Sequence, residues 1–214
     1  MSHDTWAHRM IVPAVRPLAR TSVTPNQLTA VRLAMGIAAA GAFAAGGPAW
    51  THLGGGLWIA SMLFDRADGI LARLTGKFSD WGHRFDLISD FASTVLLFVG
   101  IGVGLGAGTF GPWAPAMGVA AGLSVGIIFA LVFRIEALLP AGRSAVPSAG
   151  GFDADDVLFA VAPIAWLGWL EPFLAVAAVG APIAALIAAV IWLRLRRRPR
   201  EGGGQRSNTV VGSE

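Results

Sequence analysis

The sequence of 214 residues contains no cysteine and no tyrosine, and only 14% of its residues are charged. Without cysteine, the chain can form no disulfide, no thiolate metal site and no cysteine nucleophile. A soluble domain carries nearer a quarter of charged residues. Instead, 55% of the residues are hydrophobic, and apolar runs long enough for a helix to cross a bilayer recur along the chain. These features predict an all-α, polytopic membrane protein.

The apolar runs predict the domain organisation. Residues 1–198 are expected to form one membrane domain, which begins with a basic, amphipathic juxtamembrane segment over 1–26 lying along the interface. The tail over 199–214, rich in Gly and Ser, is expected to be disordered and cytoplasmic. Between them we expect six transmembrane helices, over about 27–46, 49–73, 82–106, 113–138, 154–170 and 173–195.

The basic residues indicate how these helices are oriented. The connections at 46–52, 107–113 and 168–173 contain none of the sixteen Lys and Arg residues, so all of these fall on one side of the six-helix layout. The positive-inside rule makes that side cytoplasmic. We therefore expect both termini in the cytoplasm, in a bacterial inner (plasma) membrane. The isoelectric point near 10.9 then reflects loops that face anionic membrane lipids, and no nucleic-acid partner is expected.

One stretch interrupts the apolar pattern, because residues 65–90 carry five Asp residues. Four of these form two pairs, which are Asp65 with Asp68 and Asp86 with Asp90. Spacings of three and four residues put the members of each pair on one face of a helix. Ionisable residues next to membrane spans are costly and are functional by default. This stretch is therefore the candidate functional site.

The residues between the two pairs predict how they meet. Gly76 is typical of a helix end and Ser79 of a helix N-cap, so we expect a helical hairpin that turns between them. Such a hairpin would bring all four carboxylates together. Four carboxylates share a small space at neutral pH only with cations between them, and hard divalent cations prefer oxygen ligands. The stretch predicts a site for divalent metal, with room for two ions.

The same residues carry a resemblance to a known family. The pattern resembles the signature of the CDP-alcohol phosphatidyltransferases (class I, integral membrane) at every fixed position, and the run TPNQLTAVR over 24–32 is similar to the start of that family's first membrane helix. The resemblance implies an enzyme of phospholipid biosynthesis. It would transfer a phosphatidyl group from CDP-diacylglycerol to a small polar alcohol and release CMP. The matched pattern is Asp65-x2-Asp68-Gly69-x2-Ala72-Arg73-x8-Gly82-x3-Asp86-x3-Asp90.

The resemblance also implies roles for the four Asp residues. Asp65, Asp68 and Asp86 would be the main ligands of a two-metal site for Mg²⁺ or Mn²⁺, and Asp90 would lie close enough to contribute. Asp90 would also be the catalytic general base, which takes a proton from the acceptor hydroxyl. The family's tendency to form homodimers implies a possible second copy as partner. The residues implied to line the CDP pocket are Gly69, Ala72, Arg73 and Gly82.

Other interpretations of the Asp stretch remain open. The carboxylates could simply be ion-paired within a structural hairpin by Arg66, Arg73 and Arg84. Within the family, the chain could be a CDP-amino-alcohol:diacylglycerol phosphotransferase, although Leu87 after Asp86 disfavours this because that branch often has His there. In other classes, the chain could be a divalent-cation channel or transporter, or a catalytically inactive scaffold.

Two further groups of residues have open roles. Arg134 and Arg143 could set the topology or hold an anionic acceptor, while the acidic residues at the start of the fifth expected span could cap a helix or contact a cationic acceptor. The acceptor alcohol therefore stays undetermined. Glycines also repeat every four residues, which predicts close helix packing either within one protomer or across a dimer. The acidic residues are Asp153, Asp155 and Asp156, and the glycines are Gly100, Gly104, Gly108, Gly118, Gly122 and Gly126.

Overall fold

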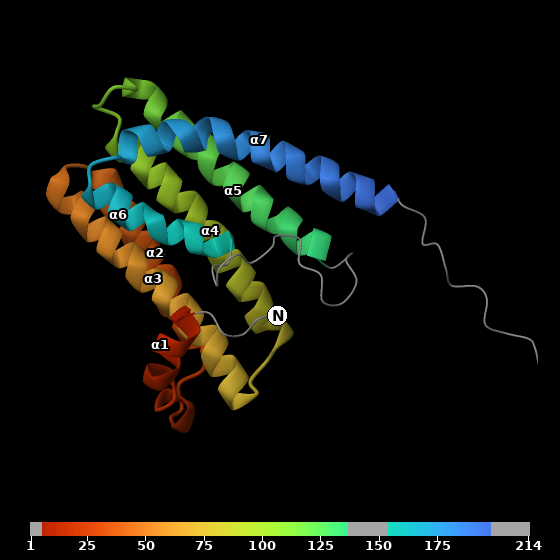
Figure 1. Ribbon diagram of the computed structural model, residues 1–214. Helices are drawn as coiled ribbons and strands as arrows, with labels where there is room; N and C mark the ends of the chain where they lie inside the picture. The colour runs from red at the N-terminus through yellow and green to blue at the C-terminus, as the bar shows by residue number, and fades with distance from the viewer. Residues whose placement is uncertain (1–5, 137–153, 198–214) are drawn as a thin grey trace, which may run out of the picture.

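The computed structural model of the protein describes residues 6–136 and 154–197 (Figure 1). Within these residues every regular element is a helix, which confirms the predicted all-α class. Arg143, Asp153 and the C-terminal tail lie outside the described residues. The elements are α1 (Trp6–Val15), η1 (Leu18–Arg20), α2 (Pro25–Ala45), α3 (Pro48–Thr75), α4 (Asp80–Gly104), η2 (Gly111–Trp113), α5 (Ala114–Glu136), η3 (Ala154–Ala160), α6 (Val161–Trp166) and α7 (Leu170–Arg197).

Capping residues define the start of α2, the end of α3 and the start of α4. At the start of α2, Thr24 and Gln27 form a capping box, in which each side chain accepts a hydrogen bond from the backbone N–H of the other. At the end of α3, Gly76 adopts a left-handed conformation with φ of 66°. Ser79 then caps α4 by accepting a hydrogen bond of 2.9 Å from the backbone N–H of Gly82. The predicted helical hairpin is confirmed.

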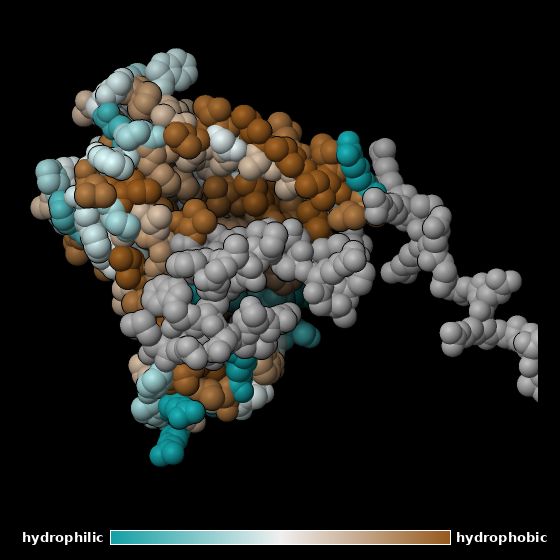
Figure 2. Space-filling view, viewed as in Figure 1, coloured by the Kyte–Doolittle hydropathy of each residue, from teal (hydrophilic) through white to brown (hydrophobic). Residues whose placement is uncertain are grey.

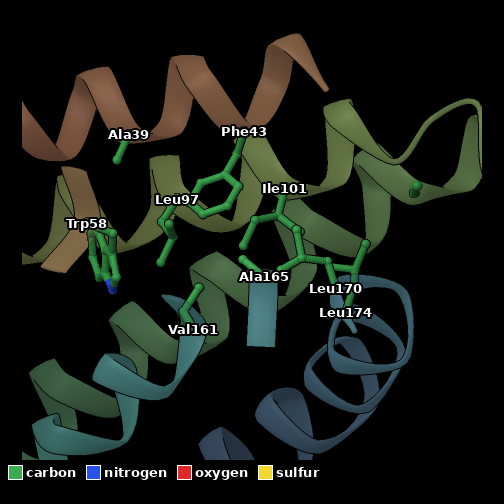
Figure 3. Close-up of a cluster of buried hydrophobic side chains, with 10 residues drawn as sticks. Ala39, Phe43, Trp58, Leu97, Ile101, Val161, Ala165, Leu170 and Leu174 are labelled. Carbon is green, nitrogen blue, oxygen red and sulfur yellow. The ribbon is translucent and has the colours of Figure 1, made fainter. Parts of the chain in front are cut away.

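Three helices form the centre of the protein. Helices α2, α3 and α4 lie side by side, α5 packs on α4, α7 packs on α5, and the short α6 lies against α3 (Figure 1). Their buried side chains meet in one hydrophobic cluster, which Figure 3 shows between these helices. Phe43, Leu97, Ile101 and Leu174 are almost fully buried there. Trp58 completes one side by donating a hydrogen bond from its indole N–H to the carbonyl of residue 158.

The repeated glycines serve packing inside the protomer. A Cβ added to Gly100 or Gly104 of α4 would clash with backbone carbonyls of α2. On α5, a Cβ added to Gly118 would clash with the carbonyl of Phe98, and one added to Gly126 would meet the ring of Phe91, both on α4. The glycines thus let three helices approach closely. The sequence pattern therefore offers no separate argument for a dimer.

Four helices among the described residues are long and apolar enough to cross a membrane by length and composition. They coincide with the first, third, fourth and sixth expected spans. Figure 2 shows that the visible side of α7 is apolar along most of its length, as a surface that faces lipid should be. The four helices cover Pro25–Ala45, Asp80–Gly104, Gly111–Ile135 and Leu170–Arg196.

The second and fifth expected spans differ from these four. Helix α3 has 28 residues, which is long enough to cross a bilayer, but its last part carries the charged motif. The fifth expected span consists of the 3₁₀-helix η3 followed by α6, with an apolar helical stretch of Val157–Trp166 that is shorter than a membrane span. Six spans therefore remain a prediction for this chain.

The segment that precedes α2 packs near the charged end of α3 (Figure 1). Helix α1 forms over Trp6–Val15 despite Pro13, as part of the segment predicted to be amphipathic. Val15 is buried in a second hydrophobic cluster together with Leu28 of α2 and Ile70 and Leu71 of α3. This cluster fixes the first turn of α2 against the helix that carries the first Asp pair.

Candidate metal and substrate site

The hairpin of α3 and α4 brings the predicted carboxylates together. One carboxylate oxygen from each of Asp65, Asp68 and Asp86 lies within 4.8 Å of the others. Asp90 follows Asp86 by one helical turn, and it contacts the same guanidinium group as Asp65 and Asp86. The predicted convergence of the two Asp pairs is therefore found in the structure.

The guanidinium group at the centre of the cluster belongs to Arg32 of α2. Its Nη1 forms an ion pair with Asp65, and it lies 3.2 Å from Oδ1 of Asp86 and 2.9 Å from Oδ1 of Asp90. Its Nη2 donates a hydrogen bond of 3.1 Å to the backbone carbonyl of Asp86. Arg32 therefore joins the two helices of the hairpin to a third helix.

Asp68 has a different partner. The Thr29 hydroxyl, also on α2, donates a hydrogen bond of 2.7 Å to Oδ2 of Asp68, and both residues are buried. Thr29 and Arg32 lie three residues apart, on one face of α2. This face thus holds all four motif carboxylates, two of them on each helix of the hairpin.

The exposure of these groups differs in a way that bears on ligand binding. The Arg32 side chain is only 3% exposed, whereas the side chains of Asp65, Asp86 and Asp90 are 39%, 38% and 48% exposed. The three carboxylates are therefore accessible to a ligand, whereas the guanidinium is almost fully covered. The carboxylate oxygens that surround the Arg32 guanidinium already bind one cation. They also form a donor set that fits a divalent metal ion.

A cavity of about 510 Å³ opens beside the cluster. Asp65, Asp86 and Asp90 lie on its wall together with Arg32 of α2, whereas the rest of the wall is largely apolar and comes from α3, α4, α5 and residue 158. Ser93 also lines the cavity, and its hydroxyl is buried without a hydrogen-bond partner. The cavity therefore combines a charged part, where the carboxylates meet Arg32, with a largely apolar part. Among its apolar residues are Trp58, Phe91, Phe129 and Phe133.

The two motif glycines have different surroundings. A Cβ added to Gly69 would touch only the guanidinium of Arg73, at 3.6 Å, so this position borders open space. A Cβ added to Gly82 would lie 2.7 Å from Oδ1 of Asn26 on α2, so Gly82 allows close helix packing. Ala72 is half-buried and Arg73 is exposed on α3, one turn beyond the first Asp pair. Close packing explains Gly82 but not Gly69.

The basic residues outside the cluster are only partly described. Arg134, at the end of α5, lines the cavity and lies over the ring of Trp192 on α7, 5.8 Å from its centroid. Arg66 lies over the ring of Phe159, 5.5 Å from its centroid. Asp155 and Asp156 lie within the 3₁₀-helix η3. Arg143 and Asp153 fall outside the described residues, so their roles remain predictions.

Thr29 and Arg32 are site residues that the sequence analysis did not assign. Arg32 is the one Lys or Arg within α2. A lone arginine in an apolar span must pair with carboxylates or carbonyls, so this signal predicts an acidic partner without identifying it. The alternative of a purely ion-paired hairpin named Arg66, Arg73 and Arg84, whereas the cation shared by three of the carboxylates comes from α2.

Comparison with solved structures identifies the fold. The chain is similar to the crystal structure of Mycobacterium tuberculosis phosphatidylinositol phosphate synthase (PgsA1) with CDP-DAG bound, with a TM-score of 0.67 and 20% identity, covering 94% of this chain and 100% of that one. For the same protein in complex with manganese and citrate, the TM-score is 0.66 and the identity 20%, covering 92% and 93%. At this identity the likeness establishes the shared fold.

Comparison of the sequence with protein families identifies the relationship. Among curated proteins, none matches the chain significantly. The family model of the CDP-alcohol phosphatidyltransferases, in contrast, matches residues 22–193, which include every helix from α2 to most of α7 together with the whole Asp cluster. The match therefore spans most of the chain, and the protein is a member of the CDP-alcohol phosphatidyltransferase family of enzymes.

Proposed function

We propose that this protein transfers the phosphatidyl group of CDP-diacylglycerol to the hydroxyl of a small polar alcohol, with Mg²⁺ or Mn²⁺ as cofactor. The observation that carries the proposal is that the motif carboxylates meet beside a largely apolar cavity, whose wall includes Asp65, Asp86 and Asp90. A donor with a charged pyrophosphate and two acyl chains needs this combination of an acidic, metal-binding end and an apolar end. Family membership supports the same reaction.

The metal ligands in this proposal are Asp65, Asp68 and Asp86, with Asp90 close enough to contribute. Bound divalent ions would supply charge that offsets the pyrophosphate and stabilises CMP as the leaving group. The carboxylates hold such ions beside the cavity, where the lipid portion of the donor can enter from the membrane. The crystal structure of the similar Mycobacterium tuberculosis protein in complex with manganese and citrate supports this choice of cofactor.

We assign the role of general base to Asp90. Its carboxylate is 48% exposed, which is the largest exposed fraction among the three that contact Arg32, and it lies on the cavity wall. The acceptor oxygen would attack the phosphorus that is bonded to the diacylglycerol oxygen. The bond from this phosphorus to the CMP oxygen would break, CMP would leave with the electron pair, and Asp90 would take the acceptor's proton.

The CDP portion of the donor would lie along α3 at Gly69, Ala72 and Arg73, with Gly82 of α4 nearby. The open space at Gly69 would let the nucleotide approach the helix backbone, since only the guanidinium of Arg73 borders it. The exposed guanidinium of Arg73 offers a fork of N–H donors for a phosphate. Gly82 would act through close packing, because it keeps α4 near α2.

The position of Arg134 bears on the charge of the acceptor alcohol. This residue lines the same cavity as Asp90, which supports an acceptor that carries a negative charge, such as a phosphorylated alcohol. The name of the similar Mycobacterium tuberculosis protein, a phosphatidylinositol phosphate synthase, is consistent with this class of acceptor. The bacterial inner membrane, six spans and a cytoplasmic active site remain part of the proposal. A homodimer is proposed from family resemblance alone.

The test is CMP release by purified protein in detergent with CDP-diacylglycerol and Mn²⁺ or Mg²⁺. Glycerol 3-phosphate, serine, inositol, inositol phosphate and choline would be added one at a time. We expect metal-dependent release with a phosphorylated acceptor, and a higher KM for that acceptor in Arg134→Gln. Release only from CDP-choline or CDP-ethanolamine in the presence of diacylglycerol would instead support the amino-alcohol branch of the family.

A further inference from the structure

The guanidinium group of Arg32 contacts three of the four motif carboxylates. Its Nη1 contacts Asp65 of α3 and both Asp86 and Asp90 of α4, and its Nη2 donates to the backbone carbonyl of Asp86. Planar guanidinium groups suit such multiple contacts because they present several N–H donors in a fixed fork. One side chain therefore links both halves of the hairpin.

The backbone of Arg32 is also held in place by α3. The Ser61 hydroxyl of α3 donates a hydrogen bond of 2.9 Å to the backbone carbonyl of Arg32, and both residues are buried. The Nε of Arg32 is buried without a hydrogen-bond partner, so the side chain gives up one hydrogen bond while its two terminal nitrogens bind the cluster. Arg32 is thus a fixed, buried charge rather than a surface side chain that can turn away.

Arg32 and its three carboxylate partners line the same cavity, but they are exposed to different degrees. The Arg32 side chain is 3% exposed, whereas its three carboxylate partners are 38% to 48% exposed. A divalent ion that enters from the cavity therefore binds oxygens that a guanidinium already contacts. Positive charges a few ångströms apart repel each other, and they also compete for the same lone pairs.

We propose that Arg32 is a positioning residue that acts as a built-in counter-cation of the site. In the metal-free protein its guanidinium holds the two helices of the hairpin together against the repulsion between their carboxylates. In the same position it weakens the affinity of the cluster for divalent ions, so that they can bind and leave. This inference rests on the ligand assignment in the proposed function.

The test measures Mn²⁺ binding to the full-length protein in detergent, by electron paramagnetic resonance of the free ion. Arg32→Gln should bind Mn²⁺ about tenfold more tightly than the wild type, because a nearby positive charge is lost. Arg32→Lys should lie between the two, since it keeps the charge but not the fork. Arg20→Gln is the matched control, because it removes an exposed arginine outside the cluster, and it should bind as the wild type does.

Thermal unfolding gives a second readout. In EDTA, Arg32→Gln should melt several degrees below the wild type, and saturating Mn²⁺ should close this gap because the ion replaces the missing charge. An equal deficit with and without Mn²⁺ would show a merely structural role and overturn the inference. If Arg32→Gln does not fold without metal, Arg32→Lys should show the same pattern to a smaller degree, and its absence there would also overturn the inference.

The results separate this inference from the ligand assignment. Binding that Asp86→Asn abolishes and that Arg32→Gln leaves unchanged, or weakens, would overturn the role of Arg32 alone. A wild-type protein that binds no Mn²⁺ would overturn the ligand assignment, and the role of Arg32 with it.

Discussion

Thr29 of α2 donates a hydrogen bond of 2.7 Å to the carboxylate of Asp68 on α3, and both residues are buried. A buried carboxylate without a donor is costly, so this contact explains how Asp68 is tolerated inside the helix bundle. The contact also orients Asp68, which contributes one carboxylate oxygen to the cluster. A residue outside the Asp motif thus positions one of its members.

Replacing Thr29 tests this contact. Thr29→Val keeps the shape of the side chain but removes the donor, so Asp68 stays buried without its partner. We expect the protein to lose about 1–2 kcal/mol of stability. Thr29→Ser is the matched control, since it keeps the hydroxyl. The measurement is thermal unfolding in detergent and EDTA, and equal melting temperatures for the valine and serine variants would contradict the account.

Gly69→Ala tests the open space on α3. The new Cβ would meet nothing closer than the guanidinium of Arg73, at 3.6 Å. Alanine also favours helices over glycine by roughly 1 kcal/mol, so we expect unchanged or higher stability. Binding of CDP-diacylglycerol should weaken, because the methyl group fills space assigned to the nucleotide. Both can be measured on one preparation, by thermal unfolding and by binding of labelled donor.

Gly82→Ala is the contrasting variant for this prediction. Its Cβ would lie 2.7 Å from Oδ1 of Asn26 and 2.9 Å from Oγ of Ser79, so both polar side chains must move and the Ser79 cap of α4 is disturbed. Loss of a helix N-cap typically costs about 0.5–2 kcal/mol. If Gly69→Ala proved as unstable as Gly82→Ala, with unchanged donor binding, Gly69 would serve packing rather than substrate.

Asp90→Asn tests the assignment of the general base. The amide cannot accept the acceptor's proton, whereas the other three carboxylates remain in place, so turnover should fall by about a hundredfold or more while donor binding changes little. Asp80→Asn is the matched control, because it makes the same charge change at an exposed position in the first turn of α4. Steady-state turnover and donor binding should be compared for both. Equal losses in the two quantities for Asp90→Asn would make Asp90 mainly a binding ligand.

The sequence predicted those features of the site that depend on residues close together in the chain, which are the two Asp pairs and the turn between their helices. Helical spacing put each Asp pair on one face, and Gly76 and Ser79 predicted the turn between the helices. Both predictions are confirmed because a helix end and a helical face are decided by residues within a few positions of each other.

Contacts between distant segments were not predictable in this way. Arg32 and Thr29 contact the motif from 33 and 39 residues away, and many polar residues could have been their partners. The division of the fifth expected span into η3 and α6 was also missed, because hydropathy alone does not distinguish a continuous helix from two shorter ones. The glycine repeats left two possibilities open, and only the packing of α2, α4 and α5 shows that they serve the protomer.

The central claim is that the carboxylate cluster holds the metal on which phosphatidyl transfer depends. The most direct test is CMP release from CDP-diacylglycerol in a Mn²⁺ titration, with the wild type and Asp86→Asn compared at the best acceptor. We expect release by the wild type that EDTA abolishes and Mn²⁺ restores, and no release by Asp86→Asn at Mn²⁺ concentrations that saturate the wild type. Full turnover by Asp86→Asn, or wild-type turnover that EDTA leaves intact, would contradict it.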